Sequence, residues 1–152
     1  MIQSVLEQFT ILPSNSSAIG FTNDDVKTRK ASCCGWLSHN EGSPLYKILS
    51  GGIYKLSFNA SVSSAVAGPV AFGLYQDGVL VPGTTSIVNI TTPGDFFNIS
   101  FDKLLEVCCR SDASLSIQAI PSVLTGTTVP GTATDTVVPI IQSANFSITK
   151  KA

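Results

Sequence analysis

Two pairs of adjacent cysteines, Cys33-Cys34 and Cys108-Cys109, are the residues whose types and spacing point most directly to chemistry. Neighbouring side chains of a β-strand point to opposite faces, so one cysteine of each pair is expected to face a core and the other to face outward. Buried free thiols, a disulfide between two strands and a four-cysteine zinc site are the three possible states. Zinc is disfavoured because C-x2-C spacing brings four sulfurs together better than tandem pairs do. An outward cysteine can also meet its counterparts on the axis of an oligomer.

A single histidine, His39, is the only imidazole that catalysis could use. Nucleophilic catalysis needs such a base beside a nucleophile and an orienting carboxylate, and nothing in the sequence around His39 brings those groups together. We therefore expect His39 to have a structural role at a strand end or in a turn. The cluster Asn23-Asp24-Asp25, expected in a solvated turn, is the one candidate for a calcium site. Overall we expect a chain without catalytic activity, metal or cofactor.

The composition excludes several classes of partner. The chain has 152 residues, enough for one domain with its own core, and 12% of them are charged while 43% are hydrophobic. The formal net charge of −1 leaves no basic surface for nucleic acid or for an anionic membrane. The first residues lack the basic start and continuous apolar stretch of a secretory signal, and no window is apolar enough to span a bilayer. We expect synthesis in a cytoplasm, without nucleic acid or membrane as a partner.

Strict alternation of apolar and polar residues is the dominant pattern of the chain. Every second residue from Tyr54 to Val62 is apolar, and the residues between them are polar. This spacing places one face of a strand against a core and the other against water. The pattern returns at residues 97–101, 115–119 and 146–148, and no segment has a convincing apolar stripe at helical spacing. An all-β chain is predicted.

Turn residues separate these runs at the spacing typical of two-sheet sandwiches. Asp77-Gly78 is the signal for a two-residue hairpin, and further Gly and Pro dipeptides divide the chain into about eight to ten strands. Residues 1–25 are predicted to be an N-terminal arm or a first strand with a possible anchoring role, and residues 26–152 the main β domain. The Thr-, Pro- and Gly-rich segment 121–139 is predicted to be a long loop of that domain.

The run ILSGGIYKLSF at residues 48–58 resembles the Gly-x-Tyr strand shared by the tumour-necrosis-factor-like (TNF-like) and complement-C1q-like jelly rolls. The order of the other motifs extends the likeness: VKTRKASCCGWLSHNEG precedes this strand, and LYQDG, VPG, VCC and NFSI follow it. This order is similar to that of small jelly-roll proteins of bacteriophages that infect gut bacteria. It is also similar to the heads of collagen-like bacterial surface proteins. Lys55 stands where the TNF strand is usually apolar, which points away from a eukaryotic cytokine, and the absence of a Gly-x-y repeat points away from a stalked spore-coat protein.

The resemblance implies an antiparallel two-sheet jelly-roll sandwich of the TNF/C1q type that assembles as a homotrimer. It also implies a structural component of a bacteriophage virion, either a head fibre or a capsid decoration protein. The low charge agrees with sheet edges that are covered by protein contacts. Alternation along the strands (here called face parity) predicts that Ile53, Tyr75 and Leu104 are apolar residues on outward faces that are otherwise polar. They are therefore the candidates for the trimer interface. The N-terminal arm is then the expected contact with the major capsid protein or another virion protein.

A host-surface or glycan-binding module is the alternative function. Aromatic faces stack on sugars, so an exposed platform built from Trp36, Tyr46 or Tyr75 favours that alternative. Alternation turns Tyr54 inward, and the sequence contains no cluster of aromatic residues that predicts such a platform. We therefore rank the structural role before the binding module.

Overall fold

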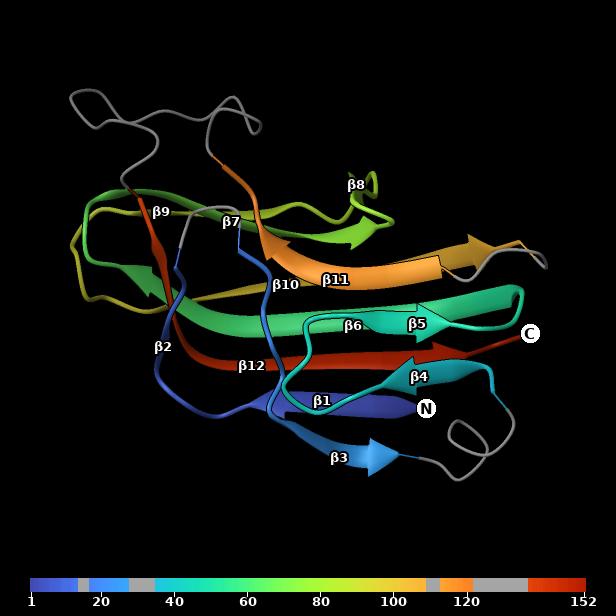
Figure 1. The fold of residues 1–152 in the computed structure, drawn as a ribbon. Coiled ribbons are helices and arrows are strands. Elements are labelled where there is room, and N and C mark those ends of the chain that lie inside the picture. The colour runs from blue at the N-terminus through green and yellow to red at the C-terminus, as the bar shows by residue number, and fades with distance from the viewer. Residues whose placement is uncertain (14–16, 28–34, 109–112, 122–136) are drawn as a thin grey trace.

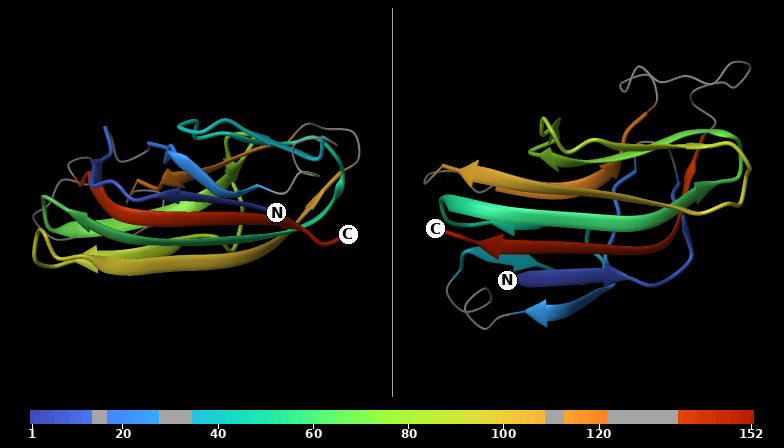
Figure 2. Two further views of the ribbon diagram at one scale, coloured as in Figure 1. Left: turned by 90° about the horizontal axis from the view of Figure 1, so that it is seen from below. Right: turned by 180° about the vertical axis from the view of Figure 1, so that it is seen from behind.

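The structure is a computed structural model that describes residues 1–13, 17–27, 35–108, 113–121 and 137–152. Two antiparallel sheets pack face to face in these ranges, so the predicted all-β jelly-roll sandwich is confirmed (Figure 1). Two further views show the same two layers from below and from behind (Figure 2). The parts of the chain described here include no helix that is long and apolar enough to cross a membrane.

Sheet A contains the long strands of the molecule. Its strand order is β10-β6-β12-β1-β3, and β2 pairs with β12 beside this path. The bounds of its strands are β1 (Ile2–Leu6), β2 (Thr10–Ile11), β3 (Asn23–Lys27), β6 (Gly52–Ser64), β10 (Phe97–Val107) and β12 (Pro139–Lys150).

Sheet B covers one face of sheet A and consists of shorter strands. Its strand order is β4-β5-β11-β7-β8, and β9 pairs with β7. The bounds of its strands are β4 (Leu37–His39), β5 (Tyr46–Ile48), β7 (Gly68–Gln76), β8 (Val79–Leu80), β9 (Ser86–Ile90) and β11 (Ala113–Ala119).

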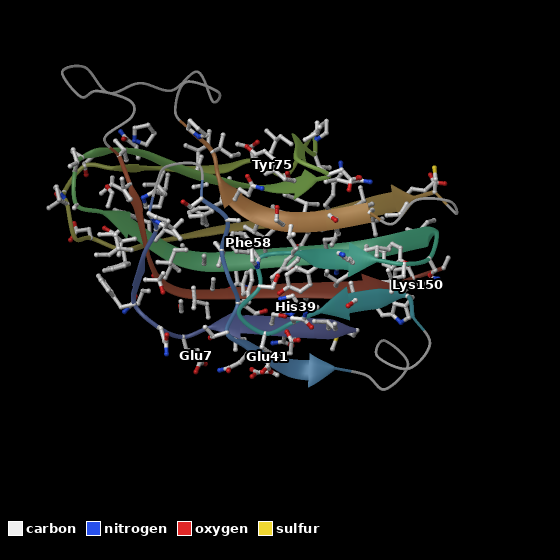
Figure 3. All side chains as sticks on the ribbon, in the orientation of Figure 1. Glu7, His39, Glu41, Phe58, Tyr75 and Lys150 are labelled. Carbon is white, nitrogen blue, oxygen red and sulfur yellow. The ribbon has the colours of Figure 1, made fainter. Side chains whose placement is uncertain are left out.

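The core lies between the two sheets and follows the alternation of the sequence. Every predicted inward residue of β6 is buried, and Phe58 sits at the centre of the sandwich (Figure 3). The predicted inward residues of β11 and β12 are buried as well; they are Leu115, Ile117, Ala119, Phe146 and Ile148. Phe97 is an exception and remains 38% exposed, because β10 begins there at the rim of the sandwich. Burial of one such large side chain contributes about 1.5–3 kcal/mol to folding.

The Gly-x-Tyr motif has a local physical reason. A Cβ atom on Gly52 would lie 2.3 Å from the carbonyl oxygen of Ala152, so only glycine leaves room for the C-terminal residues beside β6. Two residues later the hydroxyl of Tyr54 donates a hydrogen bond of 2.6 Å to the carbonyl oxygen of Ser50. The ring of Tyr54 also lies 5.8 Å from the Lys150 ammonium. The motif therefore fixes the start of β6 against the end of the chain.

The N-terminal segment enters sheet A directly. Strand β1 lies between β12 and β3, and Ile2 is opposite Ile148 in the β1–β12 ladder. Both ends of the chain consequently lie at the same end of the sandwich (Figure 1). The prediction of a solvated turn at Asp24 is wrong, because this residue belongs to strand β3 and its side chain is 3% exposed. The reason is a buried partner on the other sheet, described below.

The hairpin predicted at Asp77-Gly78 is present. Asp77 and Gly78 have φ values of 50° and 81°, the left-handed region that a tight two-residue turn requires. The turn joins β7 to the two-residue strand β8. Beyond it, the buried hydroxyl of Thr84 donates to the carbonyl oxygen of Val81 over 2.7 Å and accepts from the backbone N–H of Leu74 over 3.1 Å. Thr84 thus closes the ladder where β8 has already ended.

Replacing Thr84 with valine is expected to lower the free energy of unfolding by about 1–3 kcal/mol, because the buried N–H of Leu74 loses its acceptor. Urea denaturation measures the change. Thr10→Val is the matched control, since the Thr10 hydroxyl also donates to a nearby carbonyl oxygen, that of Gln8, but does so at an exposed position. A loss as small as that of Thr10→Val would show that the Thr84 bond is dispensable.

Candidate functional site

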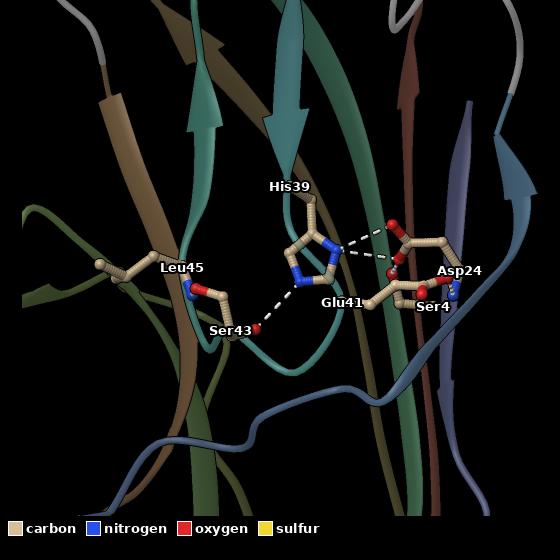
Figure 4. A network of polar contacts seen from close by, with 6 residues as sticks. All are labelled: Ser4, Asp24, His39, Glu41, Ser43 and Leu45. Atoms are coloured by element: carbon tan, nitrogen blue, oxygen red, sulfur yellow. Dashed lines mark hydrogen bonds and ion pairs between the residues drawn. The ribbon is translucent and has the colours of Figure 1, made fainter.

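A buried polar cluster joins the edges of the two sheets (Figure 4). His39, at the end of β4 in sheet B, places its Nδ1 atom 2.9 and 3.0 Å from the two carboxylate oxygens of Asp24 in sheet A. The hydroxyl of Ser4, on β1, donates to the same carboxylate. On the other side of the ring, Nε2 of His39 lies 2.9 Å from the carbonyl oxygen of Ser43. The cluster therefore ties together three strands and the β4–β5 loop.

The geometry of this cluster indicates a structural role, in which its hydrogen bonds connect the two sheets. Both ring nitrogens of His39 are engaged, Nδ1 by the carboxylate of Asp24 and Nε2 by the carbonyl oxygen of Ser43. The Ser4 hydroxyl donates its hydrogen bond to the carboxylate of Asp24. A nucleophilic serine would instead donate its hydrogen bond to the imidazole, which acts as its base. The side chain of His39 is also fully buried. The position of His39 at a strand end agrees with the prediction from the sequence.

Tyr46 completes the surroundings of His39. The two rings stack in parallel, with 3.9 Å between their centroids and 5° between their planes. Burial raises the pKa of Tyr46 well above its usual range, and the nearby Asp24 carboxylate raises this pKa further. The phenol therefore stays neutral at physiological pH, and its flat face covers the ion pair. Sequence reasoning missed this cluster because its partners come from different sheets and from distant parts of the chain.

The residues proposed for metal binding do not form a metal centre where the structure describes them. The Asp24 carboxylate is engaged by His39 and Ser4, and the residues described contain no group of three or more metal-ligating side chains of the His, Cys, Asp or Glu type. Cys108, just after β10, is exposed and is a free thiol. The remaining members of the possible thiol cluster, Cys33, Cys34 and Cys109, lie outside the described residues, so their state stays a prediction.

The outer face of sheet A, which points away from sheet B, is a wide surface with little charge. Cross-strand pairing places its side chains in rows that run over β10, β6, β12 and β1. The three central rows are Asp102–Ser57–Ser147–Gln3, Ser100–Asn59–Asn145–Val5 and Leu104–Lys55–Thr149. Within these rows only Asp102 and Lys55 carry a charge, and Glu106 lies opposite Ile53 in the next row, so covering the centre of this face desolvates few charged groups.

The structure brings two of the three predicted interface residues together. Leu104 is 63% exposed on the outer face of sheet A, and Ile53 is 42% exposed on the neighbouring strand, one row away. Tyr75 lies on β7 in sheet B, on the other side of the sandwich (Figure 3), where burial raises its pKa. The outer face of sheet A therefore combines a weakly charged centre with exposed apolar side chains near the end that holds the chain termini.

An apolar groove lies at the open edge between the sheets, next to Leu104. It has a volume of about 600 Å³ and runs between β10 and the β7–β8 hairpin. Its lining includes Val79, Leu80, Pro82, Lys103 and Leu105. Val79 at its rim is 70% exposed. The sequence predicted this hairpin but not the groove, because the groove forms where distant strands of the two sheets approach each other.

The residues proposed for a glycan platform are dispersed. Tyr46 is fully buried in the cluster described above. Trp36 packs against the core and lies 5.6 Å from the ring of Tyr54, centroid to centroid. Tyr75 stands apart from both on β7. These three aromatic residues therefore do not form a shared exposed surface.

Comparison with known proteins identifies the fold. No protein-family model and no curated protein matches the chain. Among solved structures, the globular domain of zebrafish complement 1qA protein has a TM-score of 0.64 at 9% identity and covers 99% of this chain and 96% of that one. Eiger TNF from S. frugiperda has a TM-score of 0.60 at 8% identity, with coverage of 99% and 92%. Murine APRIL has a TM-score of 0.54 at 11% identity, with coverage of 92% and 97%. The chain has the TNF/C1q-like jelly-roll fold.

Proposed function

We propose that this protein is a homotrimeric structural component of a bacteriophage virion, a head fibre or capsid decoration protein. It is made in the host cytoplasm and docks on the shell through its N-terminal segment, residues 1–25. The TNF/C1q-like fold and the order of motifs that resembles small phage jelly-roll proteins support this assignment. The engagement of both His39 ring nitrogens supports a non-catalytic role.

The observation that carries the trimer is the outer face of sheet A. Leu104 and Ile53 are exposed there next to Lys55 and Glu106, at one end of the rows of small polar side chains. Val79 is exposed at the adjoining edge. A cyclic trimer places a different part of each copy against the next and closes without leaving a free edge. Such an arrangement buries the exposed apolar side chains. It also covers the edge strand β10, whose unpaired backbone groups could otherwise pair with a strand of another protein.

The alternative function is a module that binds a host-surface receptor or a glycan. The separation of Trp36, Tyr46 and Tyr75 counts against a sugar platform made of these residues, so the structural role keeps the first place. Co-purification discriminates the two functions. A structural component sediments with intact virions at a fixed ratio to the major capsid protein. A loosely held or absent protein that instead binds host cells would support the alternative.

Light scattering of the purified protein is expected to give a mass about three times the chain mass of 15.9 kDa. Ile53→Glu is expected to weaken the trimer about 100-fold, because each copy would gain a carboxylate beside Glu106, the cross-strand neighbour of Ile53, in the face that the trimer covers. The matched control is Leu45→Glu. Leu45 is 46% exposed, close to the 42% of Ile53, but it precedes strand β5 of sheet B. A wild-type protein that stays at the chain mass over all concentrations, or equal effects of both variants, contradicts the proposed interface.

A further inference from the structure

An exposed apolar surface lies at the end of the sandwich opposite both chain termini. We call it the tip patch and define it as Phe9, Ile11 and Phe96. Phe9 and Ile11 are 64% and 63% exposed, and the rings of Phe9 and Phe96 meet edge to face with 6.2 Å between their centroids. Figure 1 shows β2 and the connection from β9 to β10 at this end, far from the ends marked N and C.

The tip patch is held in place by backbone hydrogen bonds. Ile11 pairs with Ile140 in the β2–β12 ladder, and the N–H of Leu12 donates to the carbonyl oxygen of Pro139 over 3.1 Å. On the other side of the patch, the N–H of Gly94 donates to the carbonyl oxygen of Ser64 over 3.2 Å. These bonds hold the backbone beside Phe9, Ile11 and the half-buried Phe96, so the exposed apolar side chains of the patch stay together. Clustered exposure of this kind marks interaction surfaces.

Charge around the patch has one sign among the residues whose side chains the structure describes. Glu7 and Asp95 are exposed and flank Phe9 and Phe96 in the chain. The lysines whose side chains are described lie away from the tip, on β5, on the Gly52 half of β6, on the Val107 half of β10 and at the end of the chain; they are Lys47, Lys55, Lys103, Lys150 and Lys151. The backbone of Lys27 pairs with Ile2, also away from the tip. Figure 3 shows Glu7 and Lys150 toward opposite ends of the molecule. A partner that fits this end carries an apolar centre and a basic rim.

We propose that the tip patch is the docking surface for a partner protein whose contact surface has an apolar centre ringed by Lys or Arg. This inference rests on the proposed function, in which the partner is a shell protein of the virion and the docking segment is residues 1–25. Phe9 and Ile11 belong to that segment, and Phe96 extends the surface beyond it. A second copy of the chain fits less well, because a symmetric contact would bring Glu7 and Asp95 against the same residues of the other copy. In a trimer, three such patches bind the shell together and strengthen the attachment by avidity.

The test uses virions that lack this protein and the purified full-length chain. Bound copies per particle are counted after sedimentation at a subsaturating protein concentration. Phe9→Ser is expected to reduce bound copies about tenfold or more, as is typical of a central apolar contact residue. Leu45→Ser is the matched control, because Leu45 is 46% exposed but precedes strand β5 of sheet B, outside both the tip patch and the proposed trimer face, and it should bind like the wild type. The double variant Glu7→Lys/Asp95→Lys should also reduce bound copies about tenfold. Binding of the wild type is expected to fall as the salt concentration rises, and binding of the double variant should not show this fall.

Each outcome separates the inference from the proposed function. Wild-type protein that does not bind the virions overturns the proposed function and the docking partner with it. Wild-type protein that binds, with Phe9→Ser bound equally well, overturns the tip patch and leaves the proposed function standing. Light scattering of Phe9→Ser tests whether a second copy of the chain covers the patch. A fall in mass from trimer to monomer would show that it does, which overturns the inference.

Discussion

Replacing Asp24 with alanine is expected to lower the free energy of unfolding by about 3–5 kcal/mol, the cost typical of removing one partner from a buried ion pair. The substitution leaves the fully buried imidazole of His39 with its Nδ1 atom facing no carboxylate. It also removes the acceptor of the Ser4 hydroxyl. Urea denaturation at one fixed protein concentration measures the change, because the stability of an oligomer depends on its concentration.

Asp25→Ala is the matched control for this experiment. Asp25 is the neighbouring residue of β3, carries the same charge and is exposed, so its loss should change the free energy of unfolding by less than about 0.5 kcal/mol. A double-mutant cycle with Asp24→Asn and His39→Gln then isolates the coupling between the two side chains. Equal effects of Asp24→Ala and Asp25→Ala would show that the pair does not hold the sheets together.

Replacing Phe146 with alanine is expected to cost about 3–5 kcal/mol, through lost apolar burial and the cavity that remains. Phe146 is fully buried on β12 and contacts the rings of Phe21 and Tyr46, with centroids 6.0 and 5.1 Å away. These contacts link sheet A to sheet B and to the segment before β3. Phe9→Ala provides the comparison, because Phe9 is 64% exposed and its truncation leaves no cavity. Thermal unfolding followed by circular dichroism should show a large fall in Tm for Phe146→Ala and almost none for Phe9→Ala.

The parts of the fold that could be predicted are those for which the residues of a single strand or turn are sufficient evidence. The apolar residues from Tyr54 to Val62 alternate with polar ones, and this pattern alone predicts that they face a core. The turn at Asp77-Gly78 was predictable for a similar reason, because its two residues are among the few that accept positive φ at low cost. Both features depend on neighbours in the chain, so a single sequence contains enough information.

The candidate sites depend instead on residues that distant strands bring together. Asp24 has the composition of a solvated turn around it, and only the approach of His39 from the other sheet explains its burial. The contact between Phe9 and Phe96 likewise joins the loop after β1 to the connection before β10. Face parity did identify Ile53 and Leu104 as outward residues, but it could not separate them from Tyr75, since parity says nothing about which sheet a strand joins.

The adjacency of Ile2 and Ile148 in neighbouring strands makes the chain suitable for circular permutation. Paired strands lie about 4.8 Å apart, so a flexible linker of about five to eight residues connects the present ends without bending β1 or β12. Opening the chain in the exposed turn at residues 91–95 would move the new ends to the opposite pole of the sandwich. A reporter fused there would stand beside the tip patch, whereas a reporter fused at Met1 or Ala152 would leave it accessible.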